Sequence, residues 1–104
     1  VSGGQLQRAS ICRAVLHGPD ILFGDEPTGA LNSKSSEEIM DLFEELNKNG
    51  MTILLVTHDA KVSARANRVI FMKDGALESE LFFENEDQST RLTLINRKMS
   101  ELGI

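Results

Sequence analysis

A run of small and polar residues at the start of the chain is of a type that can bind a phosphate oxygen. It reads Ser2-Gly3-Gly4-Gln5. Two glycines let a backbone approach a ligand closely, and the helix expected behind them points free N–H groups and a partial positive charge at it. The Ser2 hydroxyl would add a further donor. Taken alone, the run is more often a glycine-rich turn followed by an ordinary helix cap.

An acidic pair, Asp25 and Glu26, follows the short apolar run of residues 21–23. One carboxylate at such a strand end can hold Mg²⁺, usually through water, because Mg²⁺ keeps much of its hydration shell. The other can orient or deprotonate an attacking water. A solvated turn in front of Pro27 is an equally simple explanation of the pair alone.

A histidine stands at a matching position in the next apolar run. His58 directly follows residues 52–57. It can donate a hydrogen bond to a terminal phosphate and stabilise the charge that develops as the bond breaks. A lone histidine is more often a structural hydrogen-bonding residue. Its position level with the two carboxylates is what favours a functional role.

Elements of alternating type must position these side chains. Apolar periodicity and turn residues predict helices and strands along the whole chain. The expected elements are a helix over 2–17, a strand over 21–23, a helix from 32 to about 48, a strand over 52–57, a short helix over 60–65, a hairpin over 68–83, a polar loop over 84–88 and a helix over 89–102.

The alternation of strand and helix predicts an α/β fold with parallel strands. Unbroken apolar runs indicate strands that are buried on both faces. Ligands of such sheets bind beyond the carboxyl ends of the strands. Asp25 and Glu26 end one strand and His58 ends the next, so we expect two carboxylates and an imidazole to face one cleft.

Composition excludes several classes of protein. The chain has 104 residues, 40% hydrophobic and 26% charged, which is typical of at most one globular domain. No apolar run approaches the roughly 20 residues of a membrane helix. The net charge of −5 argues against binding to nucleic acid, and Cys12, the one cysteine, excludes a disulfide framework. The opening without Met, directly before the glycine-rich run, leads us to expect a fragment of a longer protein.

Four ordered motifs together resemble those of the ABC ATPases. They are residues 1–8 (VSGGQLQR, the signature loop), 21–28 (ILFGDEPT, the Walker B strand), 29–32 (GALN, the D-loop) and 57–59 (THD, the H-loop). The resemblance covers residues 1–83, as the C-terminal part of the nucleotide-binding domain, and leaves 84–104 as a C-terminal loop and helix. It implies a partial P-loop NTPase fold: parallel strands, flanking helices and a C-terminal hairpin.

The resemblance implies that the start of the chain serves the ATP of another subunit. Ser2, Gly3 and Gly4 would contact the γ-phosphate of an ATP bound on the opposite subunit of a head-to-tail dimer. Gln5 would lie beside that nucleotide. Asn32 stands where the family usually has Asp in the D-loop, which removes a charge at the dimer interface.

The resemblance also implies separate roles for three residues at the site where the subunit binds its own ATP. Asp25 would bind Mg²⁺ through water, Glu26 would polarise the attacking water, and His58 would contact the γ-phosphate. Gly24, where Ala is commoner, should not alter the chemistry.

The family's P-loop, GxxxxGK[ST], does not occur in these 104 residues. In the family it would precede Val1, so we predict that this chain alone hydrolyses no ATP. The family's P-loop strand lies between the strand ending at His58 and the strand beginning near Arg68. Without it, two apolar strand edges are exposed. We therefore expect an isolated fragment to be marginally stable, swapped into a dimer, or rearranged.

The function that the resemblance implies is ATP hydrolysis for a transporter. The D-loop, residues 29–32 after the acidic turn of residues 25–28, resembles that of the family branch that exports antimicrobial peptides, macrolides or lipoproteins. It implies a second ATP-binding subunit and a transmembrane permease, with the chain at the cytoplasmic face of the membrane through that permease.

Two alternatives stay open from the sequence alone. One is a soluble ABC protein that acts on the ribosome or DNA, which the D-loop and the acidic charge disfavour. The other is a truncated, non-catalytic piece that only binds a partner subunit.

Overall fold

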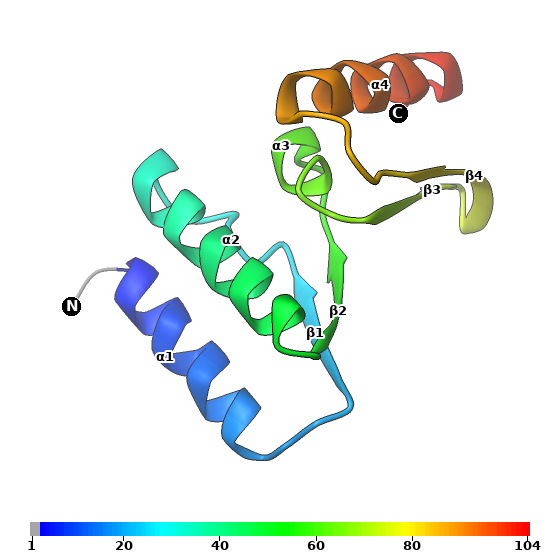
Figure 1. Cartoon of the computed structure of the whole chain (residues 1–104). Coiled ribbons are helices and arrows are strands. Elements are labelled where there is room, and N and C mark those ends of the chain that lie inside the picture. The colour runs from blue at the N-terminus through cyan, green and yellow to red at the C-terminus, as the bar shows by residue number, and fades with distance from the viewer. Residues whose placement is uncertain (1–2) are drawn as a thin grey trace. The chain divides into compact units, whose positions relative to one another are not determined.

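The computed structural model describes residues 3–104, so the predicted cap Ser2 lies outside the described part. The order of helices and strands is the one that the sequence predicts (Figure 1). The elements are α1 (Gly3–Leu16), β1 (Ile21–Asp25), α2 (Ser33–Lys48), β2 (Thr52–Val56), α3 (Ala60–Ser63), β3 (Arg68–Lys73), β4 (Ala76–Phe82) and α4 (Gln88–Leu102). None of these helices has both the length and the apolar character that spanning a membrane requires.

The chain divides into two compact units, Val1–His58 and Asp59–Ile104. The hairpin and α4 therefore share a unit. The predicted end of the ABC-like segment, between residues 83 and 84, stays a prediction. The division into compact units depends on contacts within the chain and does not test where the resemblance ends.

In the first unit, β1 and β2 pair in parallel, in register from Ile21 beside Thr52 to Asp25 beside Val56. Helices α1 and α2 both lie on one side of this sheet (Figure 1). The apolar stripe of α2 supplies the centre of the core, as its helical period predicts. The core of this unit includes the buried side chains of Ile11, Leu22, Ile39, Met40 and Phe43.

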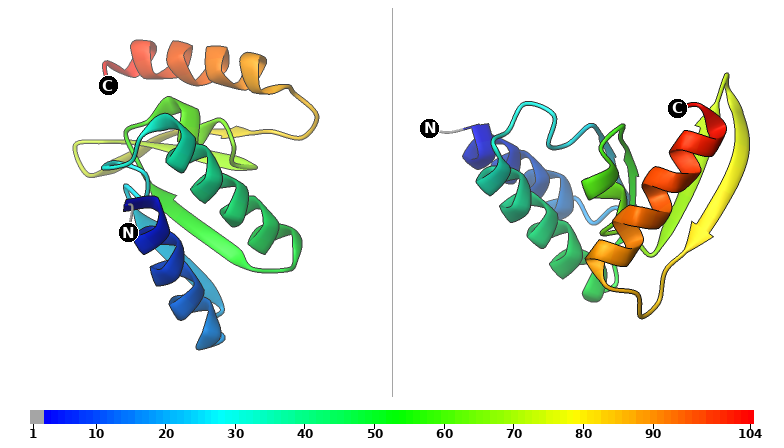
Figure 2. Two further views of the ribbon diagram at one scale, coloured as in Figure 1. Left: turned by 90° about the vertical axis from the view of Figure 1, so that its left-hand side faces the viewer. Right: turned by 90° about the horizontal axis from the view of Figure 1, so that it is seen from above.

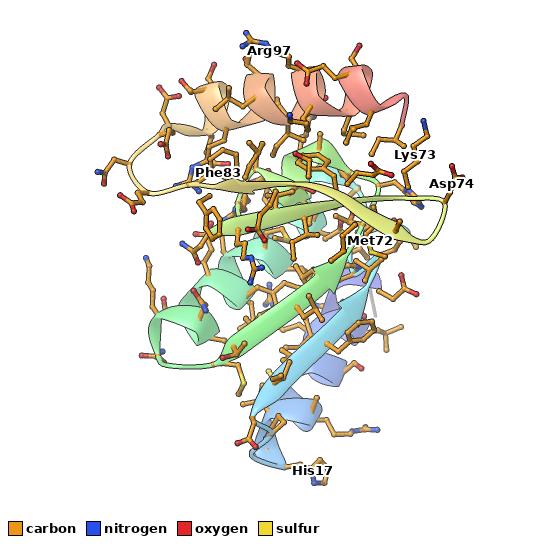
Figure 3. All side chains as sticks on the ribbon, turned by 90° about the vertical axis from the view of Figure 1, so that its right-hand side faces the viewer. His17, Met72, Lys73, Asp74, Phe83 and Arg97 are labelled. Atoms are coloured by element: carbon orange, nitrogen blue, oxygen red, sulfur yellow. The ribbon has the colours of Figure 1, made fainter. Side chains whose placement is uncertain are left out.

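The expectation that both faces of these strands are buried is wrong for the described residues. Ile21 is 57% exposed, Phe23 60%, Leu54 53% and Val56 48%, whereas Leu22 is only 7% exposed. Successive side chains of a strand point to opposite faces, and α1 and α2 cover the face of Leu22 alone. Figure 3 shows β1 and β2 in front of these helices, viewed from the uncovered side. An unbroken apolar run therefore does not prove that a strand is covered on both faces.

Each sheet in the described part has two strands, β1 with β2 and β3 with β4, so every strand has an unpaired edge. Such edges are sites where strands of other chains can add. The marginal stability or swapping that we expect of an isolated fragment stays a prediction.

The second unit is a hairpin covered by α4. The turn between β3 and β4 has Asp74 at φ 53° and Gly75 at φ 79°, the left-handed pair that an Asp-Gly hairpin turn requires. Figure 3 shows Lys73 and Asp74 at this tip. On one face of the hairpin, Val69 and Phe71 pack into a cluster with Ile95 of α4, which is 1% exposed. Helix α4 thus covers this face of the hairpin (Figure 2).

Arg91 fixes the loop before α4. Its Nε donates to the Glu86 carbonyl over 2.8 Å, and its guanidinium lies 5.1 Å from the centre of the Phe83 ring. Asp87 caps the start of α4, and its Oδ1 accepts a hydrogen bond from the Thr90 backbone N–H over 2.8 Å. This bond lowers the pKa of Asp87 below its usual value of 3.8.

We predict that the cap of α4 fails in acid. Because the folded pKa of Asp87 is lowered, its contribution is complete above the unfolded pKa and is lost as pH falls through the lowered value. The Thr90 amide resonance should therefore titrate in NMR spectra as pH falls below the usual Asp pKa of 3.8. Asp87→Asn keeps an oxygen acceptor without a titrating group and should abolish this titration. An unchanged titration in that variant would contradict the assignment.

Candidate active site

Glu26 leaves β1 in an unusual backbone conformation. Its φ is 47°, in the left-handed region that few residues other than glycine adopt. Its backbone N–H donates to the Val56 carbonyl over 2.7 Å, which continues the pairing of β1 with β2 by one residue. Left-handed residues outside glycine concentrate at functional sites, because they persist only where surrounding contacts hold them.

The carboxylate of Glu26 is held by the end of β2. The Thr57 hydroxyl donates to Oε2 over 3.0 Å, and the His58 backbone N–H donates to Oε1 over 2.6 Å. Both oxygens therefore have a donor, and the carboxylate has a defined orientation. The sequence does not single out Thr57, since a threonine in a strand is usually explained by β-propensity alone.

The structure brings Glu26 and His58 together, as their places at adjacent strand ends predict. Nε2 of His58 lies 3.9 Å from Oε1 of Glu26. The His58 side chain is fully exposed, whereas that of Glu26 is 37% exposed. The imidazole is thus free to meet a ligand in front of the carboxylate.

Asp25 occupies the last position of β1 and is exposed. Among residues 3–104, no three acidic, histidine or cysteine side chains gather closely enough to hold a metal ion by themselves. One or two carboxylates are what Mg²⁺ takes from a protein when substrate phosphates and waters complete its shell. The chemistry of Asp25 therefore fits Mg²⁺ bound together with a nucleotide.

The glycine-rich start of α1 packs against the start of α2. A Cβ on Gly4 would lie 2.9 Å from the Ser35 Cβ, and one on Gly3 would lie 3.2 Å from the Leu31 Cδ2. Gly4 is buried, while Gly3 and Gln5 are exposed at the helix end. The glycines thus have a packing reason beside the predicted ligand role, and the Ser2 role lies outside the described residues.

A shallow, open pocket of about 370 Å³ joins the start of α1 to the acidic turn. Its lining residues are Gly3, Leu6, Gln7, Asp25, Glu26, Pro27, Ala30 and Leu31. The side-chain amide of Gln7 donates to the Pro27 carbonyl beside it over 2.8 Å. The sequence does not single out Gln7 either, because a helical pattern does not say which loop a side chain meets.

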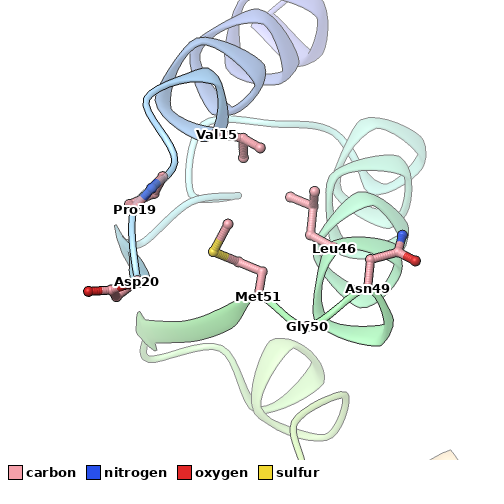
Figure 4. A pocket seen from close by; sticks show the side chains of 7 residues that line it. All are labelled: Val15, Pro19, Asp20, Leu46, Asn49, Gly50 and Met51. Atoms are coloured by element: carbon pink, nitrogen blue, oxygen red, sulfur yellow. The ribbon is translucent and has the colours of Figure 1, made fainter.

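A second open pocket, of about 340 Å³, lies at the other end of the same sheet, before each strand begins (Figure 4). It is lined by Val15, Pro19, Asp20, Leu46, Asn49, Gly50 and Met51. None of these residues was a predicted site residue, and Asp20 is the only ionisable side chain of the seven.

Known proteins resemble the chain in sequence and fold. No protein-family model matches it. The macrolide export ATP-binding/permease protein MacB of Wolinella succinogenes is 56% identical over 77 residues, which cover 74% of this chain and 12% of that protein. MacB of Campylobacter jejuni is 43% identical over all 104 residues, 16% of its own length. A dimeric structure of a bacterial ABC transporter cassette is 45% identical, with a TM-score of 0.71 over 83% of this chain and 38% of that one.

The chain belongs to the ABC family of ATP-binding domains. It spans a minor part of the length of each of these relatives. Their names confirm the predicted resemblance to the export branch, and the cassette structure confirms the predicted α/β fold. The roles predicted for individual residues stay predictions.

Within the ABC family, Asn32 departs from the usual D-loop Asp. In this chain it is the cap of α2, and its Oδ1 accepts a hydrogen bond from the Ser35 backbone N–H over 2.8 Å. Asn and Asp cap helices about equally well. The departure therefore preserves the start of α2 and changes only the charge that this position presents.

We predict that Gly4→Ala destabilises the chain. In an exposed helix, replacing Gly by Ala raises the stability of the helix by up to about 1 kcal/mol. Here, however, the new methyl group would collide with the Cβ of Ser35, which cannot move without the backbone. The free energy of unfolding should fall by about 1–3 kcal/mol, the range for overpacking. Gly3→Ala is the matched control, since it meets only the flexible end of Leu31. Urea unfolding measures both; a Gly4→Ala variant more stable than the unmodified chain would contradict the packing.

Proposed function

We propose that this chain supplies the signature, metal-binding and hydrolytic residues of an ATP-hydrolysing ABC subunit that powers export across a membrane. The observation that supports this most is the carboxylate of Glu26, held at both oxygens by Thr57 and the His58 backbone, with the His58 imidazole 3.9 Å away. A general base must be fixed within reach of the proton it takes, and this carboxylate is fixed.

The proposed hydrolysis assigns one task to each side chain. Glu26 accepts a hydrogen bond from the attacking water and orients it toward the γ-phosphate. His58, exposed in front of Glu26, donates to the γ-phosphate as negative charge develops on it. When bound, Mg²⁺ neutralises phosphate charge, and Asp25 would hold it through water.

The start of α1 serves a different nucleotide in this proposal. Ser2, Gly3 and Gly4 contact the γ-phosphate of ATP on a partner subunit, and Gln5 lies beside it. Free N–H groups at a helix start suit this task. The similar cassette solved as a dimer, and its structure described as a post-hydrolysis state bound to ADP and phosphate, support a dimer that binds nucleotide.

The proposed partners are a second ATP-binding subunit and a transmembrane permease, which the MacB relatives combine in one name as ATP-binding/permease proteins. The proposed location is the cytoplasmic face of the membrane. Because the P-loop motif is absent from these residues, the chain alone is proposed to release no phosphate from ATP.

We predict that Glu26→Gln abolishes hydrolysis in a complete subunit that carries this segment. Gln cannot take a proton from water, so the steady-state rate of phosphate release should fall at least about a hundredfold. ATP binding, measured by filter retention or fluorescence, should persist. Glu78→Gln removes an exposed carboxylate from β4 and should leave the rate unchanged. A Glu26→Gln subunit with an unaltered rate would refute the proposed role.

A further inference from the structure

Gln7 makes a contact whose position suggests more than packing. It lies on α1, and its Nε2 donates to the Pro27 carbonyl across 20 residues of sequence, over 2.8 Å and partly buried. Pro27 directly follows Glu26 in the chain. A proline has no backbone N–H, so the carbonyl is the only backbone polar group through which Pro27 can be held.

The turn of residues 26–29, which receives this bond, also makes a backbone hydrogen bond to β2 and one within itself. Glu26 donates its N–H to the Val56 carbonyl, and the Gly29 N–H donates to the Glu26 carbonyl over 3.1 Å. Thr28 is 7% exposed, so the turn is also packed. Gln7 adds a side-chain hydrogen bond from α1 to this turn. The left-handed backbone of Glu26 depends on such surrounding contacts.

Gln7 also lies on the face of α1 that carries the glycines. Residues three and four positions apart on a helix share a face, so Gln7 stands one turn beyond Gly4 and Gly3. Gly3 and Gln7 line the open pocket beside Glu26, and Gly4 packs directly on Ser35. A shift of the first turn of α1 would therefore move the Gln7 amide and pull on the Pro27 carbonyl.

We propose that Gln7 is a positioning residue for Glu26, which couples the signature end of α1 to the hydrolytic turn of the same subunit. The inference rests on the proposed function in one respect: α1 is taken to meet the partner's ATP. Its consequence is that nucleotide bound at one composite site of the dimer sets the orientation of the Glu26 carboxylate at the other. The coupling runs through a single hydrogen bond with a defined donor and acceptor.

A neighbouring residue provides the matched control. Arg8 also joins α1 to the rest of the unit, through a 2.9 Å ion pair with Glu38 of α2. Its side chain is 49% exposed, and exposed ion pairs contribute little stability. Arg8→Met and Gln7→Met introduce the same residue, with good helix propensity, at adjacent positions of α1. Only the second removes a donor from the Pro27 carbonyl.

The first measurement needs no ATP. Amide hydrogen exchange in a complete subunit that carries this segment, followed without nucleotide by NMR, should show Gly29 exchanging about fivefold faster in Gln7→Met, because the turn loses one anchoring hydrogen bond. Amides in the middle of α2 should keep their rates. Arg8→Met should leave Gly29 unchanged. Equal exchange at Gly29 in both variants overturns the coupling.

The second measurement is the steady-state ATPase of a complete subunit that carries this segment. Gln7→Met should lower kcat about tenfold, with KM for ATP and the unfolding temperature close to those of Arg8→Met, because a misplaced catalytic group affects the chemical step. Faster exchange at Gly29 with an unchanged kcat, or a change in KM alone, overturns the positioning role. An unmodified subunit that releases no phosphate overturns the proposed function instead, and leaves the exchange result to decide the coupling.

Discussion

The hydrogen bond from the Glu26 backbone to the Val56 carbonyl is the contact on which the rest of the site depends. It extends the parallel pairing of β1 and β2 past Asp25, so that the chain turns away only after Glu26 has come alongside the end of β2. Thr57 and the His58 backbone can then reach both carboxylate oxygens. A register shifted by one residue would exchange the faces of β1 and remove Glu26 from these donors.

Much of this arrangement is predictable from the sequence, because it follows from local rules. The period of Ile39, Phe43 and Leu46 gives α2, Asp74-Gly75 gives the hairpin, and adjacent strand ends bring Glu26 and His58 together. The open face of β1 and β2 was not predictable. An apolar run indicates that a strand can be buried, but it does not indicate which other elements are present to cover each of its faces.

The contacts of Thr57 and Gln7 escaped prediction for a related reason. Each is a side-chain donor whose acceptor lies far along the chain, Glu26 for one and the Pro27 carbonyl for the other. Spacing within a helix or strand fixes a side chain's direction but not its distant partner. Ser35 likewise explains Gly4 only once α1 and α2 are seen to pack closely.

We propose that the chain carries parts of two composite sites: Ser2 to Gln5 for a partner's ATP, and Asp25, Glu26 and His58 for its own. Dimers of complete subunits, tagged to pair two different variants, test it directly through phosphate release. When Glu26→Gln stands on one subunit and Ser2→Glu on the other, both defects fall in the same site, and we expect hydrolysis to persist at the other site. When one subunit carries both changes beside an unmodified subunit, both sites are damaged and hydrolysis should be lost. The reverse result, activity only when both changes share a subunit, would contradict the account.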